Sequence, residues 1–309
     1  MNKKIISALL SLALICTVLF SACGKDKVSD VFDTNSIPAI SESTEYGSLK
    51  LDSKSAIIYD INANEIIYTK DAATHRAPAS LVKLLTASTA LFYLSEDTVI
   101  TVGSEQDYVE KRSSMCFIQK GHKLTLRDLI CGLMLPSGGD AAYTIAVTVA
   151  RHVNTAYEMN DKEAIQLFVD LMNGLASEIG MKNSHFQNPD GWDHEEQYIT
   201  AEDMLKLTVY AMHVPLIKEI SSTASEYVVF ESGQNITWKN TNSMLQPNSP
   251  HYNKYITGGK TGSTDAAGKC LATIYEDGDD SYIIVVLGCK TDADRYKDTD
   301  KLIDFAKEA

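Results

Sequence analysis

The sequence lacks the patterns that mark several common kinds of binding site. Its 309 residues include six cysteines and seven histidines, yet they contain no Cys-x-x-Cys, His-x-His or His-Glu-x-x-His pattern. A zinc site is therefore not expected, and nothing else in the chain calls for a metal or another cofactor. No run of basic residues occurs, and the formal charge at pH 7 is −13. This charge argues against binding to nucleic acid or docking on anionic lipid.

The few cysteines do not make a disulfide framework. Those that follow the N-terminal segment are Cys116, Cys131, Cys270 and Cys289. Cys270 and Cys289 could face each other across a hairpin, within disulfide distance. We expect all four to be free, buried thiols.

The N-terminus has the pattern of a targeting segment. Lys3 and Lys4 precede an apolar run over 5–20, and two small residues come before Cys23. This resembles a bacterial lipoprotein signal over residues 1–22, with Cys23 as the lipidated first residue. It predicts a lipid-anchored protein on the extracytoplasmic face of a cell membrane. Ordinary signal cleavage, which would give a secreted protein, and an uncleaved anchor remain alternatives.

Residues 23–52 are rich in Ser, Asp, Glu, Lys and Thr and show no apolar period. Such a segment cannot bury enough apolar surface to offset its ordering entropy, so we expect a flexible tether. Residues 53–309 form the domain that follows it. The chain is 44% hydrophobic, which suffices for a full core.

The order of elements predicts an α/β (α+β) fold. Strand patterns at 55–60 and 65–69 flank a turn, and a mostly helical stretch follows over about 95–220. Within it, Leu124–Ile130 opens a helix, with Thr125 and Asp128 in capping-box spacing. Strand patterns then return at 227–230, before Trp238, and at 268–275 and 282–287, and a helix over 292–307 closes the chain. We expect one antiparallel sheet built from both chain ends, flanked by helices, with an inserted helical subdomain.

Three short patterns carry the chemistry. They are Ser80-Leu81-Val82-Lys83, Ser137-Gly138-Gly139, and Lys260-Thr261-Gly262, the last just before a strand. Residues three apart on a helix share a face, so Lys83 can place its amine against the Ser80 hydroxyl. To accept the proton, Lys83 must be neutral. We expect burial and a second cation, Lys260, to lower its pKa.

The other two patterns supply partners for this pair. Ser137 can relay a proton between the base and a leaving amine. Lys260 and Thr261 can bind a substrate carboxylate, and Gly262 leaves room for close approach. The backbone N–H groups of Ser80 and Ser263 are the expected oxyanion donors.

On these residues the chain resembles the serine-type D-alanyl-D-alanine carboxypeptidases, the low-molecular-mass penicillin-binding proteins with a β-lactamase/transpeptidase-like fold. The likeness covers residues 55–309. Beyond the three patterns it includes Ala77–Lys83, Phe168–Asn173, Gly180–Phe186, Asn188–Gly191, Thr241-Asn242 and Gly259–Gly268.

The resemblance implies that Ser80 forms the acyl-ester, Lys83 accepts its proton, Ser137 relays it and Lys260 anchors the substrate carboxylate. Arg295 matches the position of a second carboxylate contact. The implied activity is removal of the terminal D-Ala from the D-Ala-D-Ala stem peptides of peptidoglycan, with β-lactams as inhibitors of the same serine.

Gly139 departs from the family pattern, in which an Asn helps to orient the substrate peptide. Turnover is therefore open, and a Gly139→Asn variant with raised turnover would show that the missing amide limits the reaction. Three alternatives remain: a transpeptidase, a β-lactamase, or a non-catalytic penicillin-sensing or wall-binding lipoprotein. A class A β-lactamase needs Glu-x-x-x-Asn after the second pattern, and Glu158-Met159-Asn160 does not fit it.

The acidic cluster Asp190, Asp193, His194, Glu195 and Glu196 lacks a metal-binding spacing. We interpret it as a solvated loop. Trp192 and Trp238 are expected to pack rather than to stack on a ligand.

Overall fold

The computed structural model describes residues 34–38 and 49–308. In that part of the chain the strands are β1 (Ser55–Asp60), β2 (Glu65–Lys70), β3 (Val99–Thr101), β4 (Lys123–Thr125), β5 (Ser225–Val229), β6 (Asn235–Lys239), β7 (Ile256–Thr264), β8 (Gly268–Asp277) and β9 (Asp280–Cys289). The α-helices are α3 (Lys83–Tyr93), α4 (Leu126–Met134), α5 (Gly139–Val153), α6 (Asp161–Glu178), α7 (Ala201–Met212), α8 (Pro215–Ser222) and α9 (Asp292–Glu308). Short 3-10 turns are η1 (Thr34–Ser36), η2 (Ala79–Val82), η3 (Ser104–Tyr108) and η4 (Ser243–Leu245).

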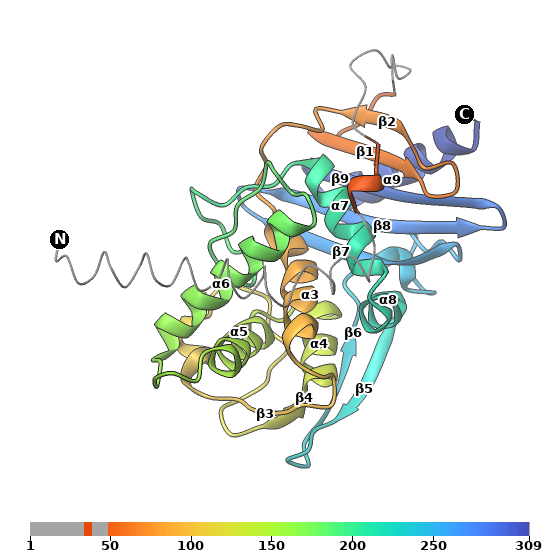
Figure 1. Cartoon of the computed structure of the whole chain (residues 1–309). Helices are drawn as coiled ribbons and strands as arrows, with labels where there is room; N and C mark the ends of the chain where they lie inside the picture. The colour runs from red at the N-terminus through yellow and green to blue at the C-terminus, as the bar shows by residue number, and fades with distance from the viewer. Residues whose placement is uncertain (1–33, 39–48, 309) are drawn as a thin grey trace, which may run out of the picture.

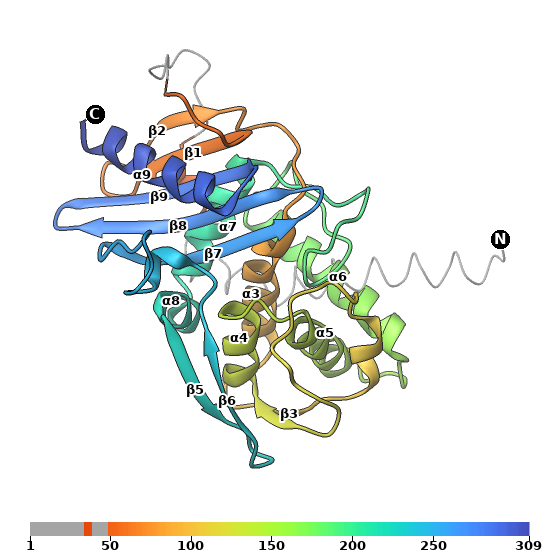
Figure 2. The ribbon, with the colours of Figure 1, turned by 180° about the vertical axis from the view of Figure 1, so that it is seen from behind.

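The main sheet joins the two ends of the domain, as predicted. Its five strands run in the order β2-β1-β9-β8-β7, and every neighbouring pair is antiparallel. Figures 1 and 2 show the sheet as one layer, with α9 on one face and α7 on the other. The strand that carries Lys260, β7, lies at the sheet edge nearest the helical part of the molecule.

Both faces of the sheet are covered, which explains the uninterrupted apolar run in β9. Ile283, Val285 and Leu287 belong to the core on the α7 side. Ile284 and Val286 belong to the smaller core under α9. Successive side chains of a strand point to opposite faces, so a strand buried on both sides needs apolar residues at every position.

The inserted part between β2 and β7 is a helical lobe below the sheet (Figure 1). Helix α3 contacts α4, α5, α6 and α7, and eight of its residues are buried. Ser80 sits in η2, directly before this central helix, so the nucleophile lies where the lobe meets the sheet. No helix of residues 34–38 and 49–308 is both long enough and apolar enough to span a membrane.

The capping box at Thr125 and Asp128 is confirmed, but the helix begins at Leu126 and not at Leu124 as predicted. The two residues exchange side-chain-to-backbone hydrogen bonds of 3.1 Å. Helix α4 therefore begins at Leu126, and the preceding Lys123–Thr125 is a strand rather than helix. The reason is local: an N-cap residue needs an extended backbone, and Thr125 has φ −71° and ψ 161°.

Two strand expectations also need correction. The hairpin of β5 and β6 forms a separate two-stranded sheet instead of joining the main one. Residues Lys260–Gly262 lie inside β7, not before a strand. The pairing of β7 with β8 is irregular between Ile256 and Gly258, and Gly259 has φ +129°, a conformation that glycine adopts readily.

The segment expected to be a tether is packed wherever the structure describes it. The Thr34 hydroxyl donates to the carbonyl of Ile179 at 2.6 Å, and Ile37 is buried in the main core. Leu51 is buried under α9, and its carbonyl accepts from Lys70 Nζ at 3.0 Å. A flexible tether over all of 23–52 is therefore wrong for residues 34–38 and 49–52, because their apolar side chains find partners on the domain. The signal segment and Cys23 lie outside the described residues.

The four cysteines named above are free and buried, as expected. Lys269, not Cys270, pairs with Cys289 across the β8–β9 hairpin. Burial raises the pKa of the Cys270 thiol to about 11 and that of the Cys289 thiol to about 12. Both thiols are therefore poor nucleophiles at neutral pH.

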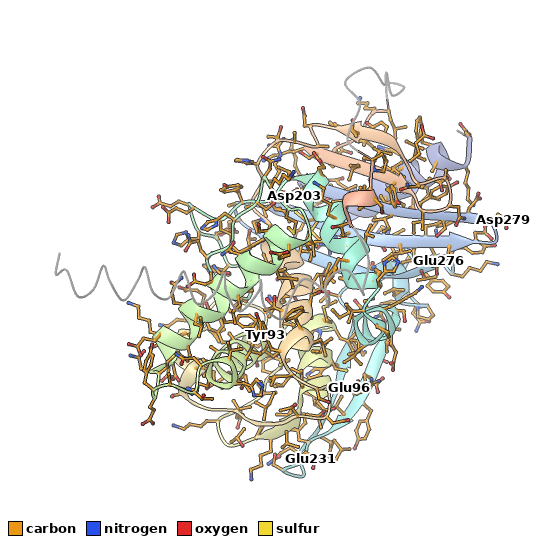
Figure 3. The ribbon with its side chains drawn as sticks, viewed as in Figure 1. Tyr93, Glu96, Asp203, Glu231, Glu276 and Asp279 are labelled. Atoms are coloured by element: carbon orange, nitrogen blue, oxygen red, sulfur yellow. The ribbon has the colours of Figure 1, made fainter. Side chains whose placement is uncertain are left out.

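Acidic side chains are spread over distant elements. Figure 3 shows Glu231 at the tip between β5 and β6, Asp279 at the β8–β9 turn and Glu96 after α3. The negative charge is therefore shared among separate surfaces.

Candidate active site

The nucleophile turn is built at η2. Ala79 has φ +49°, and Ser80 follows it, one turn before α3. A second segment presses on this turn: a Cβ at Gly191 would lie 1.9 Å from the Ala79 carbonyl oxygen. Only glycine fits there, and its φ of +85° agrees. The loop after α6 therefore supports the backbone that presents Ser80.

Ser80 and Lys83 meet as their spacing predicts. Lys83 Nζ donates to Ser80 Oγ at 3.0 Å and also to the backbone carbonyl of Asp190. The amine is 1% exposed. Burial lowers the pKa of Lys83, while the carboxylates of Asp190 and Asp140 oppose that shift. An unprotonated amine at hydrogen-bond distance is what a serine needs for activation.

Ser137 and Lys260 form a second pair beside the first. Lys260 Nζ donates to Ser137 Oγ at 3.0 Å and to the Thr261 carbonyl at 2.9 Å. Ser137 has φ +65°, which turns the chain sharply between α4 and α5. Such strained positions are common at functional sites.

The expectation that a charged Lys260 lowers the pKa of Lys83 is wrong. The pKa of Lys260 is lowered well below its ordinary value, first by burial and then by the charges of Lys83 and Arg295. Repulsion between two amines is mutual, and the one that loses its proton first no longer repels the other. Lys260 is therefore not the cation that lowers the pKa of Lys83; burial does that.

Strand β7 lies tightly against the nucleophile turn. A Cβ on Gly262 would lie 3.1 Å from Ala79 Cβ and 3.3 Å from the Pro78 carbonyl. The close approach of the described chain at Gly262 is made by the η2 turn; the approach of a substrate there stays a prediction. Beside it, the hydroxyls of Thr261 and Thr241 share a hydrogen bond of 2.6 Å.

Arg295 is a buried residue of α9, not a surface arginine, with 5% exposure. Its Nη1 donates to the Gly262 carbonyl and to Ser263 Oγ, each at 3.3 Å. Its Nη2 pairs with Asp292 at 2.7 Å. The guanidinium therefore lies directly behind β7.

One cavity of about 420 Å³ brings these residues together. Among the predicted site residues it is lined by Ser80, Ser137, Thr261, Ser263 and Arg295. Its other lining residues are Ser114, Thr241, Ser243, His251, Lys269, Asp292 and Tyr296. The lining includes two serine hydroxyls that each accept from a buried lysine, and the Arg295 guanidinium.

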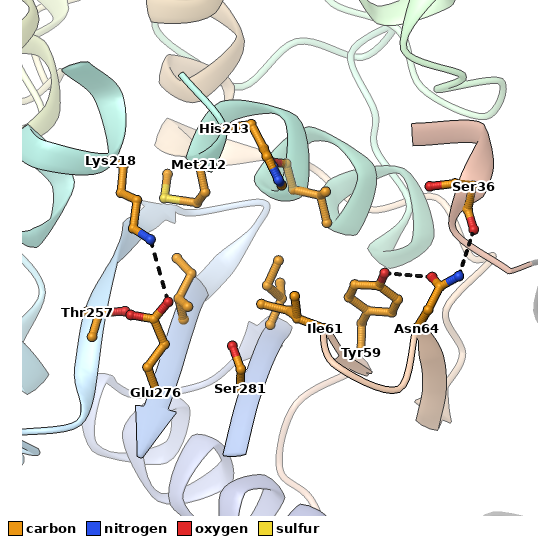
Figure 4. Close-up of a pocket in the computed structure, with 13 residues that line it drawn as sticks. Ser36, Tyr59, Ile61, Asn64, Met212, His213, Lys218, Thr257, Glu276 and Ser281 are labelled. Atoms are coloured by element: carbon orange, nitrogen blue, oxygen red, sulfur yellow. Dashed lines mark hydrogen bonds and ion pairs between the residues drawn. The ribbon is translucent and has the colours of Figure 1, made fainter. Parts of the chain in front are cut away.

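A second cavity, of about 430 Å³, lies between the sheet and helices α7 and α8 (Figure 4). Its rim carries the Lys218–Glu276 ion pair, with 3.5 Å between Nζ and Oε1. Tyr59 Oη donates to Asn64 Oδ1 at 2.8 Å on the opposite side. The residues that line this second cavity include none of the predicted site residues. The Ser80–Lys83 and Ser137–Lys260 pairs therefore lie elsewhere.

The interpretation of 190–196 as a solvated loop is wrong for its first part. Asp190 is 1% exposed, and its Oδ2 accepts from Ser113 Oγ at 2.5 Å. Asp193 Oδ1 accepts from Thr264 Oγ1 at 2.5 Å, which ties the loop to the end of β7. His194, Glu195 and Glu196 are exposed, as expected. The Asn188-Pro-Asp-Gly turn was the only sequence signal for this contact.

The two tryptophans lie outside the cavity lining. Trp238 is buried and its Nε1 donates to the Cys116 carbonyl at 2.9 Å, so it packs as expected. Trp192 is half-buried, and the Arg112 guanidinium lies 5.2 Å from its ring centre.

With this geometry in hand, the sequence matches peptidase S11, D-alanyl-D-alanine carboxypeptidase, over residues 41–291. The chain belongs to this carboxypeptidase family. Its fold agrees: a mutant of the Streptomyces K15 DD-transpeptidase superposes with a TM-score of 0.77 at 28% identity, covering 85% of this chain and all of that one.

Two relatives within the carboxypeptidase family show how far the likeness extends. The D-alanyl-D-alanine carboxypeptidase of Streptomyces sp. K15 is 32% identical over 248 residues, which are 77% of this chain and 81% of that protein. The Bacillus subtilis carboxypeptidase DacF is 26% identical over 258 residues, or 82% of this chain. The matched region spans 62% of the length of DacF.

Residues 34–38 and 49–308 contain no group of three or more His, Cys, Asp or Glu side chains placed to hold an ion. Glu158 and Asn160 do not line the cavity; instead the Asn160 side chain caps α6 by accepting from Glu163 N at 3.0 Å.

Proposed function

We propose that this protein is a serine carboxypeptidase that removes the terminal D-Ala from D-Ala-D-Ala stem peptides of peptidoglycan. The observation that carries the proposal is the 3.0 Å contact between Lys83 Nζ and Ser80 Oγ, in a cavity that also contains Ser137 and Arg295. Family membership supports the same reaction class.

In the first half-reaction, the Ser80 oxygen attacks the carbonyl carbon of the penultimate D-Ala, and the hydroxyl proton passes to the neutral amine of Lys83. The backbone N–H groups of Ser80 and Ser263 stabilise the resulting oxyanion. Breaking the peptide bond releases D-Ala, whose nitrogen takes a proton by way of Ser137. Water then attacks the acyl-ester and restores Ser80.

Substrate orientation comes from charge. The C-terminal carboxylate of the peptide binds beside Lys260, Thr261 and Arg295. The guanidinium of Arg295 lies behind β7, with Nη1 3.3 Å from Ser263 Oγ. A β-lactam carries a carboxylate and a reactive amide and is the corresponding inhibitor, acylating the same serine.

The test is release of D-Ala from a pentapeptide by residues 34–309, measured together with labelling by a fluorescent penicillin. Ser80→Ala should abolish both, with a loss of roughly 10⁴-fold or more in turnover. Equal D-Ala release by the wild type and Ser80→Ala would refute the proposal. A stable penicillin adduct without D-Ala release would instead indicate a penicillin sensor.

Transpeptidation is the second candidate, because a mutant of a DD-transpeptidase superposes on this fold. It shares the acyl-enzyme and differs only in the acceptor. An added D-amino acid or peptide amine that competes with water for the acyl-enzyme would identify it by formation of the cross-linked product.

We further propose that Cys23 is lipidated and holds the enzyme at the extracytoplasmic face of the bacterial membrane. The Lys3-Lys4 pair, the apolar run and the small residues before Cys23 support this. Cys23→Ser should move the protein from the membrane fraction to the soluble fraction. A membrane-bound Cys23→Ser protein with an intact N-terminus would indicate an uncleaved anchor.

A further inference from the structure

The space beside Gly139 is already filled by side chains from two other segments. A Cβ on Gly139 would lie 2.8 Å from Ser113 Oγ and 3.0 Å from Asp190 Oδ2. The first of these distances is shorter than real Cβ contacts show. An asparagine at position 139 would therefore have to displace the Ser113 hydroxyl, so a Gly139→Asn variant changes this contact as well as adding an amide.

These two side chains are joined to each other, and the residue after Ser113 is joined to the Gly139 backbone. Ser113 Oγ donates to Asp190 Oδ2 at 2.5 Å, and the Gly139 N–H donates to the Ser114 carbonyl at 2.7 Å. The other carboxylate oxygen of Asp190 accepts from Trp192 N at 3.2 Å. The segment before Cys116 and the loop after α6 thus meet at Gly139.

Asp190 also holds the base. Its backbone carbonyl accepts from Lys83 Nζ, which in turn donates to Ser80 Oγ. The contacts therefore run from Ser113 through Asp190 and Lys83 to Ser80.

A carboxylate in this position is costly to keep. Asp190 is 1% exposed, and no ion pair joins it to any cation among the described residues. A buried charge without a partner ion needs hydrogen bonds, and Ser113 Oγ and Trp192 N supply them to Asp190. Its negative charge opposes the effect of burial on the pKa of Lys83.

We propose that Ser113 and Asp190 are positioning residues for the Ser80–Lys83 pair and occupy the place of a side chain at residue 139. The backbone carbonyl of Asp190 accepts a hydrogen bond from the amine of Lys83 and so orients that amine. The Ser113 hydroxyl binds the Asp190 carboxylate and thereby holds the Asp190 backbone in place. This inference rests on the proposed function, since it assigns roles around the same nucleophile.

The test measures the second-order rate of Ser80 acylation by penicillin, and its pH dependence, for Ser113→Ala, Ser113→Thr and Asp190→Asn. Ser113→Ala should lower the rate about 10-fold, which is the effect expected from the loss of one hydrogen bond to a charged group. Ser113→Thr, which keeps a hydroxyl, should recover most of it. Ser104→Ala is the matched control, because its hydroxyl binds Asp161 away from the cavity and its loss should not change the rate.

The pH dependence of Ser80 acylation distinguishes a positioning role of Asp190 from a role that only fills space. The groups that face Lys83 are the carboxylates of Asp190 and Asp140, the Cys116 thiol and the Lys260 amine. Asp190→Asn removes the nearest negative charge, so Lys83 should lose its proton at lower pH. The acid limb of the acylation profile should then move to lower pH while the plateau falls.

A steric control completes the design. Gly139→Ala should slow acylation by displacing Ser113, and the double variant Ser113→Gly/Gly139→Ala relieves that clash. Because the new Cβ still lies 3.0 Å from Asp190 Oδ2, the single variant Ser113→Gly is measured beside it. A wild-type rate in Ser113→Gly means that the hydroxyl only fills space, and a lowered rate means that the hydroxyl itself matters. Wild-type rates and pH profiles for both Ser113→Ala and Asp190→Asn would overturn the inference.

The readout also distinguishes the two proposals. A wild type that is acylated but releases no D-Ala contradicts the carboxypeptidase activity and leaves the positioning roles measurable, because acylation alone reports them. A wild type that is not acylated refutes both.

Discussion

The amine of Lys260 lies 3.0 Å from the hydroxyl of Ser137, a residue 123 positions earlier in the chain. This contact joins the sheet edge to the helical lobe. It places a second buried lysine next to the Ser80–Lys83 pair, with its pKa held well below the ordinary value. Two consequences of this lowered pKa can be measured, and two further predictions concern Gly262 and Arg295.

Binding of an anionic substrate should be accompanied by proton uptake. Burial, followed by the charge of the neighbouring Arg295, favours the neutral form of Lys260, and a bound carboxylate favours the charged form. Calorimetry of a D-Ala-D-Ala peptide binding to the Ser80→Ala variant, in buffers of different ionisation enthalpy, would show up to one proton taken up near pH 7. The same peptide with a C-terminal amide is the control and should show none. Equal uptake for both peptides would contradict the assignment.

Lys260→Met should make the protein more stable at neutral pH while it destroys activity. A lysine with a depressed folded-state pKa is protonated more readily in the unfolded chain, so stability is lower below that pKa and rises with pH until the ordinary value of 10.5. Each unit of depression corresponds to about 1.4 kcal/mol. Urea unfolding from pH 7 to 10.5 should show an advantage of the variant that shrinks as pH rises. An advantage independent of pH would point to packing instead.

Gly262→Ala should reduce acylation by about 10-fold or more, with little loss of folding. The added methyl would meet Ala79 Cβ at 3.1 Å and Leu81 Cγ at 3.2 Å, which forces β7 away from the nucleophile turn and misaligns the site. Gly233→Ala is a suitable control. Gly233 has a φ of +94°, but a Cβ there would meet no atom within 4 Å, so the substitution strains the backbone without a steric clash. That variant should lose about 1 kcal/mol of stability and no activity. Similar acylation rates for the wild type and Gly262→Ala would rule out this contact as a constraint.

Arg295→Gln should weaken recognition of the substrate carboxylate. A hydrogen bond to a charged group contributes about 1.5–3 kcal/mol, so kcat/KM for D-Ala-D-Ala peptides should fall roughly 10- to 100-fold. The loss should be much smaller for a substrate whose terminal carboxylate is amidated. Because Arg295 also donates to the Gly262 carbonyl, circular dichroism and thermal unfolding must show that the variant folds. An equal loss for both substrates would mean that Arg295 supports β7 without contacting the ligand.

The sequence predicts the parts of the site whose spacing is local. Ser80 and Lys83 are three residues apart, and helix geometry alone places them together. The sheet from both chain ends follows from β-type patterns at the two termini. The prediction of Arg295 as a site residue depends on the family resemblance, because nothing in the sequence of a charged helix indicates that this arginine is buried.

The parts that were missed depend on contacts between distant loops. Asp190 stands in an acidic, turn-rich stretch that has the composition of a solvated loop, yet its carboxylate contacts Ser113, 77 residues away. Periodicity carries no information about such a pairing. The charge balance of Lys83 and Lys260 was also beyond the sequence, because it depends on which amine is more deeply desolvated.

The hydrogen bond from Thr34 to Ile179, taken with the proposed lipid at Cys23, limits how far the domain can move from a membrane. Only 34 − 23 = 11 peptide steps separate Thr34 from Cys23, and a fully stretched chain of that length spans at most about 40 Å. With the proposed lipid on residue 23, Thr34 would stay within that distance of the bilayer. The reach of Ser80 into the peptidoglycan would then be set by this short segment and the size of the folded domain.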